Sequence, residues 1–430
     1  MKRPPSRLRV DKASLFADLG YVPHAGQREV HFCAAPRRVV ACGVRWGKTL
    51  CAAMEGLAAA LQPADRSVGW VCAPTYDLAD RVFREIQVIA LTRLQHRVIS
   101  MRESERRLVI RNMAGGQSEI RAKSADNPVS LLGEGLDWLI VDEASRLKPE
   151  IWQSHLSQRL IDKPGWALLI STPRGKGYFF DLFRRGQGEA DTEWRSWNYP
   201  SWTNPLLDAE LIERERGRLP QRVFDQEFGA QFVEGSGAVF RCVREAATGE
   251  WSEPEPGRRY YAGLDLAKVE DYTVLTIIDS KLRVVFVDRF HRLDWALQVG
   301  RIKAALDRYR RADVYVDSTG GEPVLETLRR AGVPAMAYTF TSASKAALVD
   351  NLALMLEQRK LTLPRADIWP EGIEELEAFE FSISDQGRVR SGAPGGMHDD
   401  CVMSLALACW HLRPRNDLPR PSEGPRLVRA

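Results

Sequence analysis

The stretch CGVRWGKTL (42–50) combines small residues with a lysine and a threonine in a spacing that suits a phosphate-binding loop. Backbone N–H groups can turn inward around phosphate oxygens only where side chains are small, and Gly43 and Gly47 meet that need. Lys48 can then reach the β and γ phosphates of a nucleotide, and Thr49 can ligate its Mg²⁺ ion. The stretch therefore predicts an ATP site.

The elements on either side of this loop are those that a phosphate site requires. An apolar run in RRVVACGV (37–44) predicts a strand before the glycines, and KTLCAAMEGLAAALQ (48–62) predicts a helix after them. The helix would place its N-terminus beneath the phosphates. Cys42 stands where such loops usually begin with glycine, so an ordinary strand–helix turn is the alternative for this stretch taken alone.

A carboxylate pair follows a second apolar run, in LDWLIVDEAS (136–145). A run without polar alternation is typical of a strand buried on both faces of a parallel sheet, and ligands bind at the C-terminal ends of such strands. We expect Asp142 to hold Mg²⁺ through water and Glu143 to polarise the attacking water. The alternative is that the pair only caps the next helix. Its occurrence together with the Gly-Lys-Thr loop favours a working site.

Other polar residues could join this nucleotide site. Segments 67–86 and 166–183 are each predicted to form a strand, a turn and a helix. Ser171 and Thr172 would stand at the tip of the second of these strands, where they could sense the γ-phosphate and couple hydrolysis to a moving element; plain turn chemistry is the alternative. Gln27, upstream of the loop, could contact adenine, as in helicase-like ATPases, or be a solvated surface residue.

The second half of the chain supplies carboxylates from three separate elements. Asp265 lies in the middle of a predicted strand, Asp317 ends another, and the Asp399–Asp400 pair opens a predicted amphipathic helix. An antiparallel meander over 260–290 and a helix come before the strand of Asp317. This order of elements is that of an RNase H-like fold with a mixed sheet.

Convergent acids of this kind suit metal-dependent phosphodiester cleavage. Two hard divalent cations, Mg²⁺ or Mn²⁺, need three or four carboxylates and open coordination positions. One ion would activate water and the other would stabilise the leaving oxygen. Each acid also has an ordinary alternative, because aspartate is a common turn former and a common helix N-cap.

The length and composition of the chain favour a two-domain globular protein. Its 430 residues exceed the usual size of one core, and 44% are hydrophobic and 27% charged. We expect an ATPase domain (1–235), a Pro- and Glu-rich linker (236–258), a nuclease domain (259–412) and a disordered Pro- and Arg-rich tail (413–430).

No apolar run is long enough to cross a bilayer, and the basic N-terminus lacks the apolar core of a secretory signal. The seven cysteines are expected to be reduced thiols, and the net charge of +4 permits a polyanionic partner without requiring one.

The full series of motifs resembles the large subunit of the terminase, the DNA-packaging motor of tailed bacteriophages. The resemblance runs from about residue 20 to about residue 412. Its motifs are, in order, GVRWGKT, APTY, LIVDEAS, STPRG, PSWTNP, FDQEFGAQFVE, GLDLAKVEDYTV, VDSTG and MHDD. It implies a RecA/ASCE-like P-loop ATPase domain with a mainly parallel sheet, followed by an RNase H-like nuclease domain.

The resemblance also assigns residues. It puts Lys48 and Thr49 on the triphosphate and its magnesium, and Asp142 and Glu143 on magnesium and water. It also implies that Asp265 and Asp317 are metal ligands, joined by one or both of Asp399 and Asp400, and Asp271 is a weaker metal candidate. Arg45 matches a basic residue inside the family's phosphate loop and is implied to contact the γ-phosphate. Some family members carry an arginine that reaches a neighbour's nucleotide, but this chain has Leu132 at that position. Arg121 is the nearest upstream basic residue and is a weak candidate for that role.

The family's activity implies ATP-driven translocation of double-stranded DNA into procapsids and endonucleolytic cutting of concatemers. The implied partners are double-stranded DNA, a terminase small subunit and the portal protein. The implied state is a homo-oligomeric ring during packaging, and a monomer in solution is compatible with it. The protein would work in the cytoplasm of the infected host, transiently at the portal. Alternatives are an ATP-dependent helicase-nuclease, which should carry a second RecA-like domain, and a non-catalytic DNA-recruitment subunit with decayed sites.

Overall fold

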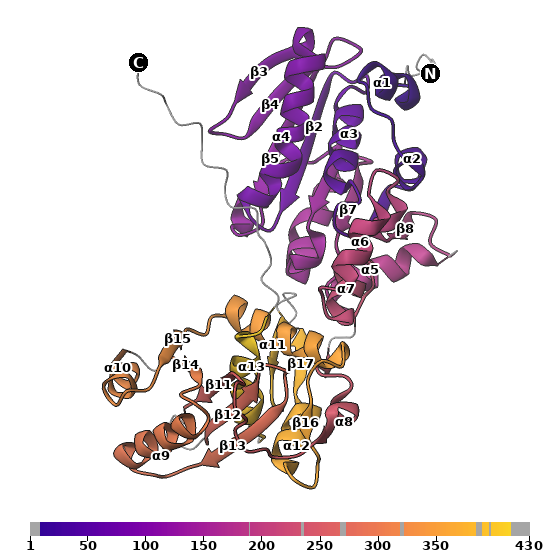
Figure 1. Ribbon diagram of the computed structural model, residues 1–430. Coiled ribbons are helices and arrows are strands. Elements are labelled where there is room, and N and C mark those ends of the chain that lie inside the picture. The colour runs from indigo at the N-terminus through magenta and orange to yellow at the C-terminus, as the bar shows by residue number, and fades with distance from the viewer. Residues whose placement is uncertain are drawn as a thin grey trace, which may run out of the picture. The chain divides into compact units, whose positions relative to one another are not determined.

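The computed structural model describes residues 9–188, 190–233, 236–266, 272–318, 322–383, 389–394 and 397–413. The chain forms two compact units (Figure 1). Unit 1 comprises Met1–Ser236 and Ser382–Val389, and unit 2 comprises Gly237–Phe381 and Arg390–Ala430. The expected tail therefore lies outside the described residues except for Arg413, and so does Asp271.

Unit 1 is built on an eight-stranded sheet in the order β3-β4-β5-β2-β6-β7-β1-β8. Six neighbouring strands, from β5 to β8, run parallel, and β3 and β4 extend the sheet in antiparallel pairing. The strands are β1 (Arg37–Cys42), β2 (Arg66–Ala73), β3 (Val98–Arg102), β4 (Arg107–Arg111), β5 (Gln117–Ser124), β6 (Trp138–Asp142), β7 (Trp166–Ser171) and β8 (Trp194–Tyr199). The sheet is mainly parallel, as the sequence predicts.

Helices cover both faces of this sheet, which explains the unbroken apolar runs of its central strands. In β1, Val40 packs into one core and Val39 into the other, and alternate residues of β6 and β7 divide in the same way. The α-helices are α1 (Lys12–Asp18), α2 (Ala25–Phe32), α3 (Lys48–Ala60), α4 (Tyr76–Arg93), α5 (Tyr178–Gln187), α6 (Ala209–Arg216) and α7 (Gln221–Glu227). Short helical turns are η1 (Gln95–Arg97), η2 (Pro128–Leu131), η3 (Ala144–Arg146), η4 (Ile151–Leu156), η5 (Ser157–Leu160) and η6 (Ser201–Thr203).

Unit 2 is built on a five-stranded mixed sheet in the order β13-β12-β11-β14-β15. The first three strands in the chain form an antiparallel meander, and β14 and β15 add in parallel. Its strands are β11 (Tyr260–Asp265), β12 (Thr273–Asp279), β13 (Val284–Phe290), β14 (Asp313–Asp317) and β15 (Ala335–Tyr338). This sheet confirms the expected RNase H-like fold class.

The helices of unit 2 are α8 (Val243–Ala246), α9 (Trp295–Arg308), α10 (Glu322–Arg330), α11 (Ser342–Glu357), α12 (Pro370–Ala378) and α13 (Asp400–Trp410). A two-stranded sheet pairs β10 (Ala247–Gly249) with β16 (Leu363–Pro364), and a three-stranded sheet has the order β18 (Val389–Gly392), β17 (Glu380–Ile383), β9 (Ser236–Ala238). The segment expected to be a linker thus contains β9, α8 and β10.

Two local predictions in unit 2 are wrong. Asp265 is the last residue of β11 and does not lie in the middle of a strand. The helix α13 is not amphipathic, because every residue from Asp400 to Cys409 is buried. It packs directly on β11, where Ser404 donates a hydrogen bond to the Gly263 carbonyl over 2.9 Å. A central helix that is covered on all sides needs apolar residues all round.

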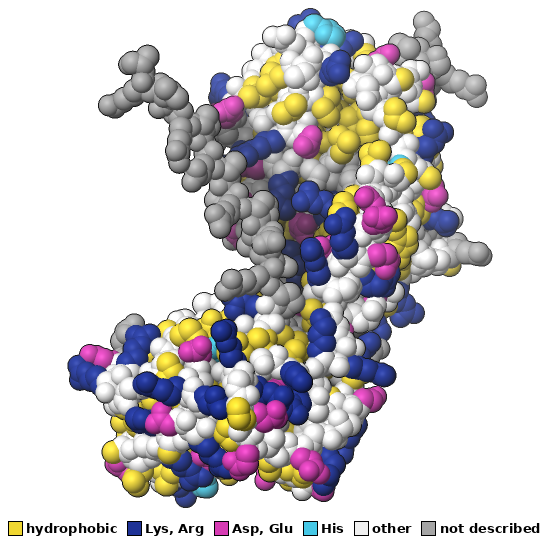
Figure 2. All heavy atoms as spheres, in the orientation of Figure 1, with side chains coloured by type: hydrophobic (Ala, Val, Ile, Leu, Met, Phe, Trp, Pro, Cys, Tyr) yellow, Lys and Arg dark blue, Asp and Glu magenta, His cyan; other side chains and the backbone are white. Residues whose placement is uncertain are grey.

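None of the helices within the described residues is long and apolar enough to span a membrane. In the space-filling view, Lys and Arg side chains are numerous on the face shown of each unit, with acidic side chains among them (Figure 2). Among the described residues, the large sheet of unit 2 is mixed and contains an antiparallel meander, so it is not the mainly parallel sheet that a second RecA-like domain of a helicase-nuclease would have.

Candidate active sites

The loop between β1 and α3 is held from outside through four consecutive carbonyl groups. The Ser201 hydroxyl donates to Val44 O over 2.6 Å, and Asn204 Nδ2 donates to Arg45 O over 2.9 Å. His24 Nε2 lies 3.1 Å from Trp46 O, and Gln27 Nε2 donates to Gly47 O over 3.2 Å. With its carbonyl oxygens engaged on the outside, the loop and the N-terminus of α3 are arranged to present N–H groups to an anion.

Both loop glycines are required by their surroundings. Gly47 has φ +100°, a conformation that side chains disfavour. A Cβ on Gly43 would lie 2.6 Å from Phe228 O and would also meet the Ser201 hydroxyl. Cys42, by contrast, is the buried last residue of β1, and burial raises the pKa of its thiol to about 12. The neutral thiol fits the core there, which explains why this loop can begin without glycine.

Gln27 is buried at the first turn of α2 and is not a solvated surface residue. Its Oε1 accepts a hydrogen bond from His24 N over 3.2 Å, while its amide nitrogen supports Gly47. The side chain therefore braces the loop in this structure. Arg45 has an exposed side chain and a left-handed backbone with φ +60°.

Asp142 is the last residue of β6, and Glu143 follows it. Both lie beside the loop, because β6, β7 and β1 are neighbours whose C-terminal ends share one edge of the sheet. Lys48 Nζ lies 3.8 Å from Glu143 Oε1, and Arg146 Nε lies 3.2 Å from Glu143 Oε2. Glu143 has a left-handed backbone with φ +50°, and its side chain makes no capping hydrogen bond to the following η3. The carboxylate therefore faces the lysine of the loop and does not serve as a helix cap.

The electrostatics of the site couple these groups. Burial, and then the negative charge of Glu143, raise the pKa of Asp142 to about 7, against the opposing effect of Lys48. Burial alone would lower the pKa of Lys48, but neighbouring groups including Cys42, Glu143 and Asp142 raise it, so the ammonium stays charged. Two close carboxylates at this edge, one of them buried with a raised pKa, favour a divalent cation as a partner beside Lys48 and Arg146.

Ser171 and Thr172 lie at the end of β7, between the strands that carry the loop and the carboxylates. Ser145 Oγ lies 2.8 Å from Ser171 Oγ and donates to Thr172 O over 2.8 Å. Tyr178 of α5 donates to the Ala144 carbonyl. The segment that follows Glu143 is thus hydrogen-bonded to the end of β7 and to α5.

Three charged residues beside the loop were not predicted from the sequence. Arg146 pairs with Glu143, and Arg174 Nη2 lies 3.6 Å from Glu227 Oε1. The backbone carbonyl of Glu227 accepts a hydrogen bond from Val44 N over 2.7 Å, which fixes this residue against the loop. Arg146 could have been found from its place three residues after Glu143, whereas Glu227 has no local signal.

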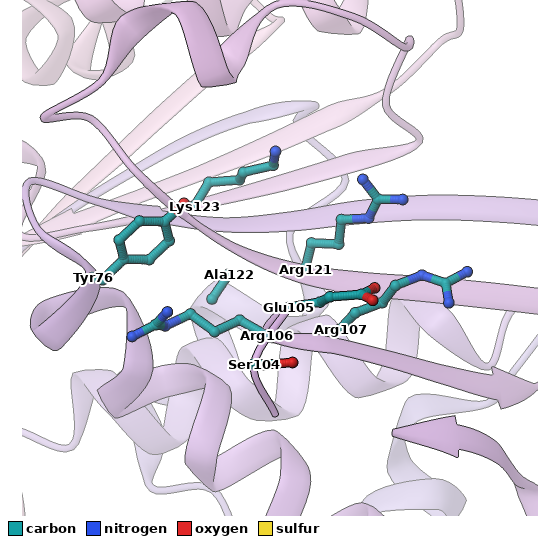
Figure 3. Close-up of a pocket in the computed structure, with 8 residues that line it drawn as sticks. All are labelled: Tyr76, Ser104, Glu105, Arg106, Arg107, Arg121, Ala122 and Lys123. Atoms are coloured by element: carbon teal, nitrogen blue, oxygen red, sulfur yellow. The ribbon is translucent and has the colours of Figure 1, made fainter. Parts of the chain in front are cut away.

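A basic pocket opens over β4 and β5, with a cavity volume of about 310 Å³ (Figure 3). It is lined by Tyr76, Ser104, Glu105, Arg106, Arg107, Arg121, Ala122 and Lys123. Glu119 forms ion pairs with both Arg107 and Arg121, and the Arg121 side chain is 34% exposed. Leu132 lies after η2 and is 53% exposed. Arg121 therefore lies on an open basic surface of unit 1, outside the loop site.

The acids of unit 2 come from neighbouring elements. Asp265 ends β11 and Asp317 ends the adjacent β14, while α13 brings Asp399 and Asp400 to the same end of the sheet. Burial, and then the negative charges of Asp400, Asp317 and Asp399, raise the pKa of Asp265 well above its ordinary value. Each of the other three carboxylates is therefore close enough to Asp265 to repel its charge.

The two adjacent aspartates have different surroundings. Asp400 is 7% exposed, accepts a hydrogen bond from Tyr272 N over 3.2 Å and lies 3.6 Å from His398 Nδ1. Asp399 occupies the N-cap position without a side-chain capping bond, and its Oδ2 lies 3.2 Å from Lys345 Nζ. Neither side chain is thus explained as a helix cap.

Lys345 and a further buried acid, Glu375, were not predicted from the sequence. Glu375 Oε2 accepts a hydrogen bond from Cys401 N over 2.8 Å, and its Oε1 lies 3.4 Å from Arg289 Nη2. Glu375 therefore holds the first turn of α13, which carries Asp400. Its burial raises its pKa.

Within the described residues, no three or more His, Cys, Asp or Glu side chains are already arranged as ligands around one point. The donor set nevertheless fits divalent cations, because it consists of hard carboxylate oxygens whose mutual repulsion a bound cation would relieve. Lys345 is the cation that opposes the raised pKa of Asp265.

Comparison with known proteins gives matches along both units. The family model "Terminase large subunit, T4likevirus-type, N-terminal" matches residues 40–246, and "Terminase RNaseH-like domain" matches residues 262–412. The chain is 31% identical over 436 residues to the terminase large subunit of Thermus virus P23-45, and 31% identical over 432 residues to that of Thermus phage G20c. Each match covers 91% of this chain and 88% of the relative. The large terminase of another thermophilic bacteriophage, solved in complex with ADP, is similar in fold, with a TM-score of 0.54 and 14% identity, covering 90% of this chain and 98% of that one.

Proposed function

Because this chain belongs to the terminase large-subunit family, we propose roles for its individual residues in DNA packaging. The family membership confirms the resemblance seen in the sequence and makes the chain a DNA-packaging ATPase and nuclease. Nucleotide and divalent metal are therefore its cofactors. The proposals below concern which residues act, which metals they take and which partners they meet.

In unit 1, Lys48 and the backbone of the phosphate loop bind the β and γ phosphates of ATP. Thr49 and Asp142 hold its Mg²⁺, and Glu143 orients the attacking water. The observation that supports this assignment is the 3.8 Å approach of Lys48 Nζ to Glu143 Oε1 across the edge of the sheet. Arg45, exposed on the loop, is proposed to contact the γ-phosphate.

Three further residues are proposed to support this reaction. Ser171 and Thr172 couple hydrolysis to movement, since they are hydrogen-bonded to Ser145 just after Glu143. Gln27 acts by holding the loop through Gly47 O, and contact with adenine is a second role that its position at the loop allows. The large terminase solved with ADP, which has a similar fold, is consistent with nucleotide binding here.

In unit 2, Asp265, Asp317, Asp399 and Asp400 are proposed to ligate two divalent ions, Mg²⁺ or Mn²⁺, that supply an activated water and stabilise the leaving oxygen. The raised pKa of Asp265, caused by burial and by the other three acids, supports this site. Of the adjacent pair, the more buried Asp400 is the better placed as the main ligand. Asp271 lies outside the described residues and stays a weaker candidate.

The partners follow from packaging. Double-stranded DNA is the substrate, and we propose that the chain meets a small subunit and the portal, forms a ring there and is a monomer when free. This places it in the cytoplasm of the infected host and transiently at the procapsid. Arg121, partly exposed in the basic pocket of Figure 3, is proposed as the arginine that reaches a neighbour's nucleotide. The proposed domain limits remain 1–235 and 259–412, joined by 236–258.

Two substitutions test the separation of the reactions. Glu143→Gln should abolish ATP hydrolysis, retain ATP binding and leave plasmid nicking intact. Asp265→Asn should abolish nicking with Mg²⁺ and with Mn²⁺ and leave ATP turnover intact. Asp288→Asn, which changes a largely buried acid of unit 2 that pairs with Arg301, is the matched control. Parental hydrolysis by the first variant, or parental nicking by the second, would refute the corresponding assignment.

A further inference from the structure

Arg174 is a cation beside the phosphate loop, and the residues around it do not use all of its N–H donors. Its Nη2 lies 3.6 Å from Glu227 Oε1. This separation is longer than the roughly 2.7–2.9 Å of a charge-assisted hydrogen bond. Its Nε is buried and has no hydrogen-bond partner among the described residues. The Nε atoms of Arg38, Arg107, Arg159 and Arg289 are unpartnered too, so this donor supports a ligand only together with the position of Arg174 beside the phosphate loop.

The position of Arg174 fits a phosphate as that ligand. The residue follows Ser171 and Thr172 in the loop after β7, and β7 lies between the strands that carry Glu143 and the phosphate loop. Its side chain is 21% exposed, so it is accessible from one side. Arginine presents a planar fork of N–H donors that matches phosphate oxygens.

The local charges also favour an added anion. Burial, and then the positive charge of Arg146, lower the pKa of Arg174, and Glu227 and Glu143 only partly compensate. Arg146 is itself paired with Glu143. The surroundings of Arg174 are therefore short of negative charge, which the terminal phosphate of ATP would supply.

Glu227 is the present partner of Arg174, and Arg174 would have to give up this ion pair to bind a phosphate. It ends α7, and its backbone carbonyl is fixed to the loop by Val44 N over 2.7 Å. Its carboxylate is one of the negative groups that raise the pKa of Lys48. The Glu227 carboxylate thus lies near two of the cations that a γ-phosphate would contact.

We propose that Arg174 is a ligand of the ATP γ-phosphate, exchanging its loose pair with Glu227 for a phosphate oxygen when ATP binds. The inference rests on the proposed nucleotide site and extends it by one cis-acting arginine. ADP lacks the γ-phosphate, so Arg174 stays with Glu227 in that state. The exchange frees the Glu227 side chain at the end of α7 and so makes the position of α7 sensitive to the nucleotide.

The test measures binding of Mg²⁺-ADP and of a non-hydrolysable Mg²⁺-ATP analogue to the full chain by calorimetry. Arg174→Ala should weaken the ATP analogue by about 10- to 100-fold, the value of one charge-assisted hydrogen bond, and change ADP binding by less than about threefold. Glu227→Gln should keep the preference for the ATP analogue, because it removes the competing carboxylate. Arg174→Lys keeps the charge but not the planar fork of N–H donors. Its affinity for the ATP analogue should therefore lie between those of Arg174→Ala and the parent.

Arg301→Ala is the matched control, since it breaks an arginine–carboxylate pair in unit 2. Thermal unfolding without nucleotide identifies variants that fail to fold, and Arg174→Gln then replaces Arg174→Ala. A purely structural pair would make Arg174→Ala and Glu227→Gln alter both nucleotides alike. That result, or an Arg174→Ala preference for the ATP analogue over ADP within about threefold of the parent, overturns the inference. A parent chain that binds neither nucleotide would instead refute the nucleotide site itself.

Discussion

Glu55, in the middle of α3, is a buried carboxylate that ties the phosphate-loop helix to three other elements. Its side chain is 1% exposed. Its oxygens lie 2.7 Å from Lys12 Nζ of α1, 2.7 Å from His31 Nδ1 of α2 and 2.9 Å from Arg38 Nη2 of β1. The perturbation that tests this cluster is Glu55→Gln, which keeps the shape of the side chain and removes its charge.

The size of the effect follows from the burial of the partners. The Arg38 side chain is only 4% exposed, so the variant leaves a buried guanidinium without its counter-charge. Breaking a buried pair in this way costs about 3–5 kcal/mol of unfolding free energy. That is a large part of the roughly 5–15 kcal/mol typical of a domain, so unit 1 should be strongly destabilised. Because Lys48 begins the same helix, nucleotide binding should weaken as well.

The assay is denaturant unfolding of the full chain at pH 7, monitored by tryptophan fluorescence. The measurement is made with and without ADP, because the transition that ADP shifts is that of unit 1. The control is Asp191→Asn, whose partner Arg185 is 52% exposed, and it should change the unfolding free energy by about 1 kcal/mol or less. If Glu55→Gln stays within about 1 kcal/mol of the parent, the reasoning from burial is refuted.

The same cluster predicts a dependence on pH. Burial would raise the pKa of Glu55, but Arg38, a hydrogen bond from His31 and the charge of Lys12 lower it below its ordinary value. A carboxyl whose pKa is lower in the folded state stabilises the fold above its unfolded pKa, here about 4.5, and loses that contribution as the pH falls. The difference between parent and Glu55→Gln should therefore shrink below about pH 4.5. A constant difference down to pH 3 would contradict the assigned charge.

Three further predictions concern the two sites. Gly43→Ala should lower the stability of unit 1 by about 1–3 kcal/mol and abolish ATP binding, because the added Cβ would lie 2.6 Å from a carbonyl oxygen; Gly177→Ala, with open space around it, should be near neutral in the same unfolding and binding assays. Gln27→Ala should weaken ATP and ADP about equally, by about tenfold in a calorimetric titration, since it removes a brace of the loop and no phosphate contact. In plasmid nicking with Mn²⁺, Asp400→Asn should reduce the rate more than Asp399→Asn, because Asp400 is more buried and contributes more to the raised pKa of Asp265.

Much of the fold could be predicted because its signals are local. The apolar runs before Gly43 and Asp142 mark strands that are buried on both faces, and the helix that begins at Lys48 has few breakers. The meander and acid-bearing strand of unit 2 are visible for the same reason. The features that the sequence misplaces depend on tertiary surroundings. The helix α13 is covered on all sides although its pattern suggests an exposed face, and the end of β11 at Asp265 has no sequence marker.

The candidate sites were predicted only as far as their residues lie in compact motifs. Lys48 and Glu143 belong to such motifs, and the structure brings them to 3.8 Å from each other. Lys345 and Glu375 do not, and Glu227 lies in a motif, 224–234, that was not assigned to the nucleotide site. Each of the three reaches its site from an element far away in the sequence. Their roles follow from sheet order and helix packing, which one sequence does not reveal.

The contacts of the phosphate loop indicate how its chemistry can reach the rest of unit 1. Its outer side is bonded to Ser201 and Asn204, which follow β8, and to the backbone of Glu227 at the end of α7. Any change of loop conformation on hydrolysis must therefore break or move contacts with the segment 199–228. We expect this segment to follow the nucleotide more readily than the buried strands of the sheet, because core strands are close-packed and resist displacement.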